Sequence, residues 1–244
     1  MAAYDKFAQY YIDRRKDKSR FDYNRDIEVP ALIKIIGDVK NKTILDIGCG
    51  FGDHAKKLSK QKYKKLIGFD ISKEFVKYAN EENITNSMFY VGDMSKKLKH
   101  SNSSFDIVYS SLAIHYIKNL NKLFKEVNRV LKKRGVFCFS TGHPIFTLLG
   151  QNKEKIIGVS KDKRKIYGNY FDDSQKYYNL GSLGEVKLCN HTFETLIKTG
   201  LNNGFELIDY KDAKPIKSSE KYDPRKYKLT NTLPSFILFK FKKR

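Results

Sequence analysis

An apolar run that ends in a carboxylate and is followed at once by three alternating glycines, ILDIGCGFGDH at residues 44–54, sets the fold of this chain. The apolar run predicts a buried strand, and the residues after the glycines predict a helix. Glycine permits a tight turn and lets a ligand approach the backbone closely. The first turn of a helix offers unpaired N–H groups. The segment therefore predicts a nucleotide-type ligand at a strand-turn-helix unit.

Short apolar strands and amphipathic helices alternate along most of the chain. Strands are expected at TILDIG, LIGFD, MFYVGD, FDIVYSS, GVFCFST, FELIDY and FILFKF, and helices at residues 51–60, 73–81, 120–131 and 192–202. The helix at 120–131 is expected to end in the basic turn Lys132-Lys133-Arg134-Gly135. This βαβ repetition predicts an α/β protein with a parallel sheet.

Two segments depart from the repetition. Residues 1–40 are expected to form an N-terminal helical cap, with a second helix starting at Pro30, and residues 41–244 the main domain. Between about residues 143 and 190 the periodicity stops. Aromatic residues are scattered through this polar stretch: Tyr167, Tyr170, Phe171, Tyr177 and Tyr178. We interpret it as an insertion that faces and covers a substrate.

The charge balance is strongly positive, with 48 basic and 27 acidic residues and a net charge of +21. Such a balance raises the possibility of a nucleic-acid or membrane-surface partner. The excess is mostly lysine in scattered pairs such as Lys56-Lys57, without an arginine-rich block, which favours solvated helix faces. No obligate protein partner is evident. The chain starts with charged residues where a signal peptide would be apolar, and no apolar run is long enough to span a bilayer, so we expect a cytoplasmic protein without a membrane partner.

The three cysteines, Cys49, Cys138 and Cys189, are odd in number and far apart. They include no Cys-x-x-Cys pair, so the sequence indicates neither a disulfide framework nor a metal site.

The spacing of the glycines separates this turn from the dinucleotide fingerprint. Counted from Gly48, the third glycine of that fingerprint would fall at Asp53, whereas the glycine here is Gly52. Asp70 closes the second strand about 20 residues further on, where an acid accepts hydrogen bonds from ribose hydroxyls. Asp93 ends the third strand, where its carboxylate could accept a bond from an adenine amine. The ring could be sandwiched by Ile71, Met94 and Leu98.

The order of these motifs resembles the class I S-adenosylmethionine-dependent methyltransferases, particularly the small-molecule branch called methyltransferase type 11. The resemblance covers about residues 40–142. It implies a Rossmann-like fold: a seven-stranded, mostly parallel sheet with helices on both faces, an antiparallel last strand and an insertion after the fifth strand. It also implies S-adenosylmethionine as the cofactor. In that family the glycine turn holds the methionine part, the acid after the second strand holds ribose, and Gly-Asp-Met holds adenine.

The predicted cofactor residues follow from these matches. The segment FDIVYSSLAIHYI resembles the family's fourth-strand segment, whose last residues lie beside the sulfonium. In related enzymes an N-terminal helix can fold over the cofactor, which adds Tyr11. The full predicted set is Tyr11, Asp46, Gly48, Cys49, Gly50, Gly52, Asp70, Ile71, Asp93, Met94, Ser110 and Ser111.

A base is needed if the methyl acceptor is a hydroxyl or a protonated amine, and imidazole is suited to that role near neutral pH. His115 and His143 each follow a predicted strand at the ligand-binding edge of the sheet, so they are the candidates. Packing in a helix or turn is the alternative for both. His54 and His100 are expected to be exposed to solvent, and Thr192 is expected to cap the helix that follows it.

Three functions remain open from the sequence. The first is methyl transfer to an oxygen or nitrogen of a small-molecule acceptor. The second is methylation of RNA, such as tRNA, which the net charge favours. Methylation of an exocyclic base amine usually needs an Asn/Asp-Pro-Pro-aromatic turn, whereas this chain has Ser110-Ser111-Leu112-Ala113 at that place. Methylation of a cytosine carbon needs a cysteine nucleophile, typically beside a proline, and no cysteine here neighbours a proline. Both absences argue against methylation of a base at these atoms. The third is a non-catalytic, cofactor-binding regulatory subunit.

Overall fold

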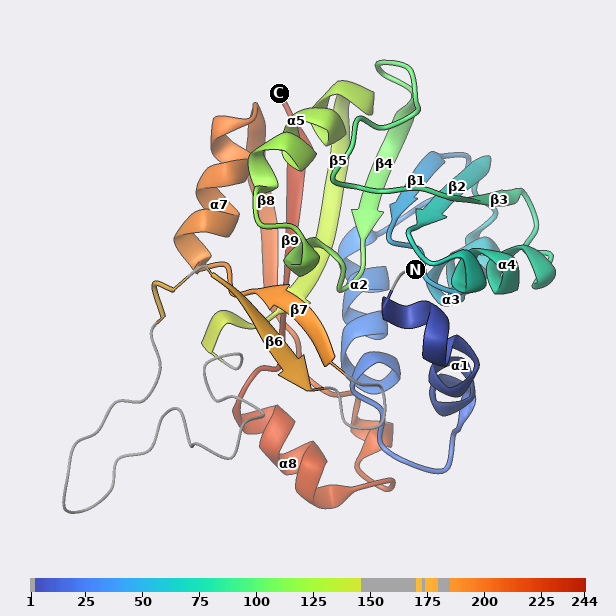
Figure 1. Ribbon diagram of the computed structural model, residues 1–244, viewed down its shortest axis with the longest axis vertical. Helices are drawn as coiled ribbons and strands as arrows, with labels where there is room; N and C mark the ends of the chain where they lie inside the picture. Colours follow the sequence, from blue (N-terminus) through green and yellow to red (C-terminus); the bar gives the residue numbers. More distant parts are fainter. Residues whose placement is uncertain (1–2, 146–169, 173, 180–184) are drawn as a thin grey trace.

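Seven strands pair into one sheet in the computed structural model, which describes residues 3–145, 170–172, 174–179 and 185–244 (Figure 1). The strands are β1 (Thr43–Ile47), β2 (Lys65–Asp70), β3 (Ser87–Val91), β4 (Phe105–Ser110), β5 (Leu131–Gly142), β8 (Phe205–Asp212) and β9 (Phe236–Lys243). Their order in the sheet is β3-β2-β1-β4-β5-β9-β8. The pairs from β3 to β5 are parallel, and β9 runs antiparallel to both of its neighbours. The predicted Rossmann-like, mostly parallel sheet with an antiparallel last strand is confirmed.

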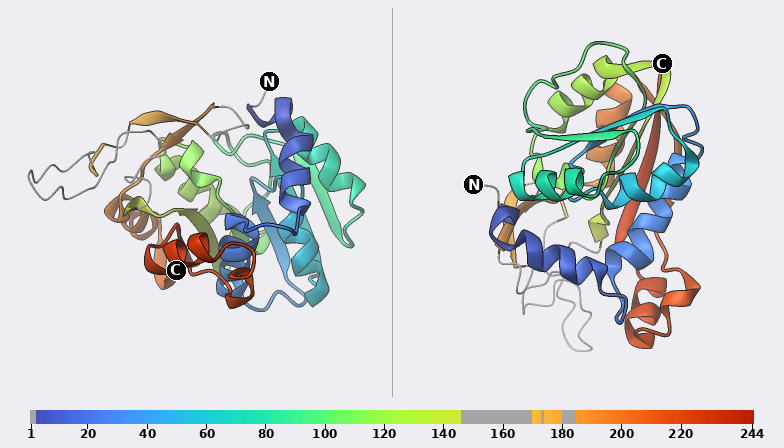
Figure 2. Two further views of the ribbon diagram at one scale, coloured as in Figure 1. Left: turned by 90° about the horizontal axis from the view of Figure 1, so that it is seen from below. Right: turned by 90° about the vertical axis from the view of Figure 1, so that its right-hand side faces the viewer.

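Helices cover both faces of the sheet, because successive strand residues point to opposite sides. Ile44 of β1 packs in a core with α2 (Val29–Ile36), α3 (Asp53–Leu58) and α4 (Lys73–Glu81). Its neighbour Leu45 packs in a second core with α5 (Leu120–Val130) and α7 (Phe193–Asn202). Figure 2 shows the two helical layers on either side of the strands. This explains why the parallel strands read as continuous apolar runs rather than alternating ones.

Two local expectations about helix ends have different outcomes. Thr192 caps α7 as predicted, with its hydroxyl accepting the Thr195 N–H at 3.1 Å. The basic turn expected to end α5 is wrong, because Leu131 already has extended backbone and residues 131–135 begin β5. Lys132 pairs there with Asp106 at 2.9 Å, which holds its side chain against β4 instead of the helix end.

The N-terminal segment packs beside the carboxyl ends of the parallel strands (Figure 1). It consists of a 3-10 turn η1 (Ala3–Phe7), α1 (Ala8–Lys16) and a single π-helical turn η2 (Asn24–Glu28) that leads into α2. Ala8 and Ile12 of α1 are buried against Phe75 of α4. The second helix starts at Val29, one residue before the proline predicted to open it.

The predicted insertion contains a hairpin of β6 (Gln175–Asn179) and β7 (Glu185–Cys189), next to η4 (Ile114–Tyr116). Residues 146–169, including Tyr167, lie outside the described part of the chain, as does the side chain of Tyr178. The remaining elements are η3 (Ser59–Gln61), η6 (Lys217–Ser219) and α8 (Pro224–Thr232). Across the described residues, no helix is both long and apolar enough to cross a membrane. The three cysteines are buried.

Candidate cofactor and acceptor cavity

A cavity of about 570 Å³ lies at the carboxyl ends of the parallel strands. We call one part the cofactor half, defined by Gly48, Gly50, Asp70, Asp93 and Met94. The acceptor half is defined by Tyr4, Tyr11, Ser111, Tyr116 and Val186. Most of the predicted cofactor residues line this one cavity: Tyr11, Gly48, Cys49, Gly50, Asp70, Ile71, Asp93, Met94 and Ser111.

The glycine loop leaves space for a ligand against its backbone. Gly48, Gly50 and Gly52 have φ angles of 74°, 52° and 84°, which residues with a Cβ rarely adopt. A Cβ on Gly48 would lie 2.5 Å from the Cβ of Ala113, whereas a Cβ on Gly50 would meet no atom within 4 Å. Gly50 lines the cavity, and Gly52 lies outside its lining, at the start of α3. The open space beside Gly50 therefore belongs to the cofactor half.

Asp70, at the end of β2, fixes this loop. Its Oδ2 accepts the N–H of Gly50 at 2.9 Å, and its Oδ1 accepts the N–H of Ser72 at 2.9 Å. Burial raises the pKa of Asp70, although these N–H groups act in the opposite direction. Next to Asp70 in the chain, Ile71 is 57% exposed and lines the cavity, so it offers an apolar surface to a ligand ring.

The third strand contributes the other side of the cofactor half. Asp93 and Met94 both line the cavity just after β3, as predicted. Leu98, expected to help sandwich the ring, is instead 4% exposed and packs in the core that includes α5. Of the three residues expected to sandwich the adenine ring, Ile71 and Met94 line the cavity and Leu98 does not.

Asp46 lies behind the glycine loop rather than on the cavity surface. The hydroxyl of Tyr109 donates to its Oδ2 at 2.6 Å, while Oδ1 is buried and has no hydrogen-bond partner in the described part of the chain. Burial raises the pKa of Asp46 to about 7. Asp46 therefore supports the glycine loop from behind, and the open space beside Gly50 is the feature that fits the methionine part of S-adenosylmethionine.

Aromatic side chains from separate elements wall the acceptor half. The rings of Tyr4, Tyr11, Phe51 and Phe75 contact one another with centroids 5.5 to 6.3 Å apart. The hydroxyls of Tyr4 and Tyr116 are 2.5 Å apart, which links η1 to η4. Burial raises the pKa of the Tyr4 hydroxyl, so this wall stays uncharged at physiological pH.

Among the described residues, two Arg or Lys side chains line the cavity: those of Arg15 and Lys187. The Arg15 side chain is only 6% exposed and forms ion pairs with Asp22 and Asp53, the latter at 3.3 Å. Its charge is thus compensated within the protein. Lys187 is exposed on β7.

Glu28 and His54 form a buried pair beside the acceptor half that the sequence did not reveal. His54 lines the cavity, and its Nε2 lies 3.1 Å from Oε2 of Glu28. The expectation that His54 is exposed to solvent is wrong, because it is 8% exposed and lies next to the η2–α2 junction that carries Glu28. A possible signal was Glu28 itself, a lone charge in the apolar run IEVPALI. His100 is half-buried and bonds the Tyr90 hydroxyl at 2.9 Å.

The two histidines predicted as bases do not line the cavity. His115 is packed beside Thr141, with Nδ1 3.3 Å from the Thr141 hydroxyl, and burial lowers its pKa to about 4. His143 has Nε2 3.3 Å from Asp212, while its Nδ1 accepts the N–H of Ile145. Ser110 also lies outside the lining, where its hydroxyl donates to the Ile47 carbonyl at 2.8 Å.

Known proteins resemble this chain in sequence and in fold. The family model of the methyltransferase domain matches residues 38–212. An uncharacterized protein of Methanocaldococcus jannaschii is 30% identical over 211 residues, 84% of this chain and 75% of that protein. An uncharacterized protein of Haemophilus influenzae is 29% identical over 153 residues, 60% of each protein. The crystal structure of an S-adenosylmethionine-dependent methyltransferase from Mesorhizobium loti superimposes with a TM-score of 0.72 at 25% identity, over 88% of this chain and 96% of that one.

Proposed function

This chain belongs to the methyltransferase-domain family and carries an S-adenosylmethionine-dependent methyltransferase domain, and we propose that it methylates an oxygen or nitrogen atom of a small-molecule acceptor. The observation that carries the proposal is the continuity of the cavity. One space of about 570 Å³ runs from the cofactor half into the acceptor half. Sites of roughly 300–1,000 Å³ with apolar walls and a few polar groups are typical of small molecules.

The chain's own residues would bind and align the two reactants. When bound, S-adenosylmethionine supplies a methyl carbon activated by its sulfonium. The space beside Gly50 would hold the methionine part, Asp70 the ribose hydroxyls, and Asp93 with Met94 the adenine. Ser111, just past β4, lines the acceptor half. Alignment of this kind can supply much of the rate of an in-line displacement.

The acceptor half favours a small, partly apolar molecule. Its aromatic walls are uncharged, and the polar side chains that line the cavity include Asn24 and Ser111, besides the ion-paired Arg15 and the exposed Lys187. The hairpin residue Val186 lines the cavity and is buried. A nucleoside in an RNA chain would need phosphate contacts from cations near this opening. Arg15 is already paired, which weakens that reading.

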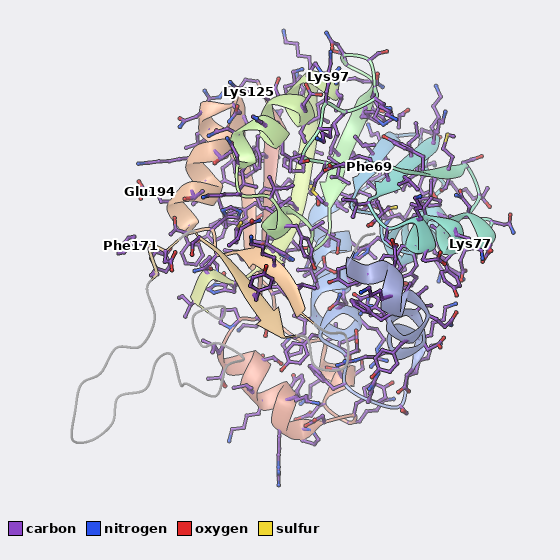
Figure 3. All side chains as sticks on the ribbon, viewed as in Figure 1. Phe69, Lys77, Lys97, Lys125, Phe171 and Glu194 are labelled. Atoms are coloured by element: carbon purple, nitrogen blue, oxygen red, sulfur yellow. The ribbon has the colours of Figure 1, made fainter. Side chains whose placement is uncertain are left out.

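RNA methylation is the second candidate, and the net charge of +21 favours it. Among the described residues, however, only two Lys or Arg side chains line the cavity, Arg15 and Lys187. Figure 3 shows Lys77, Lys97 and Lys125 pointing outward from different parts of the surface, on α4, after β3 and on α5. Dispersed lysines of this kind support solubility rather than a phosphate track.

A methyl-transfer screen tests the proposal. The full chain is incubated with methyl-labelled cofactor and small amines, phenols, carboxylates or bulk tRNA, and labelled products are counted. We expect label in a small molecule, and loss of cofactor and product binding by calorimetry in Asp70→Ala but not in Asp209→Ala, an exposed carboxylate on β8. Label in tRNA, with steeply salt-dependent binding, would replace the small-molecule proposal with the RNA one. Tight cofactor binding without any labelled product would favour the regulatory-subunit reading.

A further inference from the structure

His54 lines the cavity, and one of its ring nitrogens is bonded to a buried carboxylate. It stands in the first turn of α3, two residues after Gly52. Its Nε2 is bonded to Glu28, whereas its Nδ1 has no hydrogen-bond partner in the described part of the chain. Because His54 lines the cavity and is 8% exposed, Nδ1 is the ring nitrogen left for a ligand.

Glu28 is held in place from three sides. The hydroxyls of Ser111 and Ser140 donate to its Oε1 at 2.8 and 2.5 Å, and His54 occupies its Oε2. The carboxylate is fully buried, so each of its oxygens has a partner and its orientation is fixed. Ser111 also lines the cavity, so the cluster reaches the acceptor half.

We propose that His54 Nδ1 accepts the proton of the acceptor's O–H or N–H group during methyl transfer, with Glu28 as the positioning residue that orients the imidazole. This inference rests on the proposed function. Neither His115 nor His143 can take the role in this geometry, because neither lines the cavity and both nitrogens of His143 are engaged.

The step conserves charge and atoms. The acceptor's lone pair forms the new bond to the methyl carbon while the carbon–sulfur bond breaks. The electron pair of the broken carbon–sulfur bond stays on sulfur. The acceptor's proton passes to Nδ1. The positive charge lost from the sulfonium therefore ends on an imidazolium that faces the Glu28 carboxylate, and the proton returns to water after product release.

The groups around the dyad set its pH dependence. Besides Glu28, the titratable groups that face it come from α1, β1, α3 and β4: Tyr11, Arg15, Asp46, Asp53 and Tyr109. Burial alone lowers the pKa of His54, but the carboxylates, with Glu28 foremost, outweigh it and the net pKa is raised. His54 is thus charged at lower pH, and the neutral base is populated as the pH rises through the raised pKa.

Nitrogen NMR of labelled histidines tests the dyad without any acceptor. In the full chain with S-adenosylhomocysteine bound, His54 should titrate above the ordinary range, and its neutral form should carry the proton on Nε2. Glu28→Gln should lower the His54 pKa, because the facing carboxylate is removed, while Glu28→Asp keeps the charge and provides a second variant if Gln unfolds the chain. A neutral form protonated on Nδ1, or no titration between pH 5 and 10, would overturn the assignment.

Rates with the acceptor identified by the screen give the second readout. His54→Gln keeps a donor for Glu28 but removes the cavity-facing base, so kcat should fall about 10²- to 10⁴-fold with the KM for cofactor unchanged. Glu28→Gln should move the alkaline rise of kcat to lower pH. His100→Gln, which changes an imidazole outside the cavity, should leave both unchanged. An unaltered kcat in His54→Gln refutes the dyad, whereas absent transfer in the wild type refutes the proposed function and leaves NMR to decide on the dyad.

Discussion

Adding one methyl group to Gly48 or to Gly50 should separate stability from cofactor binding. Both glycines have positive φ, so alanine costs each about 1–2 kcal/mol of backbone strain. At Gly48 the new methyl also lies 2.5 Å from the Cβ of Ala113, and overpacking of this kind adds about 1–3 kcal/mol. The free energy of unfolding should therefore fall by about 2–5 kcal/mol in Gly48→Ala but by only about 1–2 kcal/mol in Gly50→Ala.

Gly50→Ala should mainly weaken cofactor binding, whereas Gly48→Ala should mainly lower the stability of the fold. Its added methyl meets no protein atom within 4 Å and enters the space of the cofactor half. If the clash costs the ligand about 1–3 kcal/mol, affinity for S-adenosylhomocysteine drops about 5- to 150-fold. Urea unfolding followed by circular dichroism measures stability, and calorimetry measures affinity.

Gly204→Ala is the matched control for this pair. Gly204 also has positive φ, at 79°, and an alanine there would lie near Asn128 rather than at the cavity. It should lose stability and keep its affinity for S-adenosylhomocysteine. Wild-type affinity in Gly50→Ala, or equal stability of the Gly48 and Gly50 variants, would refute the reasoning.

Three further perturbations follow from the core and the site. Gly200→Ala adds a methyl 2.3 Å from the buried Phe241 ring, so overpacking should outweigh the gain in helix propensity of about 1 kcal/mol and lower the urea midpoint; a raised midpoint would contradict the packing. Asp46 keeps its proton up to about pH 7 when folded, so its contribution to stability falls by about 4 kcal/mol at most as pH rises from 4 to 8. Asp46→Asn should flatten that dependence in urea titrations at the two pH values, and an unchanged slope would count against it. Burial raises the pKa of Cys49 well above its usual value. Iodoacetamide at pH 8 should therefore leave Cys49 unmodified in the folded chain and alkylate it after denaturation. Rapid modification of Cys49 in the folded chain would contradict this prediction.

The sheet and the cofactor half were predictable because their determinants are local in sequence. The glycine turn follows its strand directly, and Asp70 ends the next one, so period and spacing place both at the same sheet edge. Asp93 is placed by the same rule one strand later. These residues needed no knowledge of how distant segments pack.

The acceptor half was not predictable to the same degree. His54 looked like a surface residue because its partner, Glu28, lies 26 residues earlier in a π-helical turn that the apolar pattern does not indicate. The position of His143 was read correctly as the end of a strand. The expectation that His143 faces the ligand was not correct. Because β5 pairs with β9, His143 lies beside Ser235 and Asp212 instead.

The two halves of the cavity also differ in how far apart in the chain their contacts lie. The Gly50–Asp70 bond that shapes the cofactor half joins residues 20 apart. In the acceptor half, the Tyr4–Tyr116 and Glu28–Ser140 bonds each join residues 112 apart. Closing a longer loop costs more entropy, so each bond that shapes the acceptor half has to offset a larger closure cost than the Gly50–Asp70 bond does. As the chain warms or partly unfolds, we expect the cofactor half to keep its shape after the acceptor half has come apart.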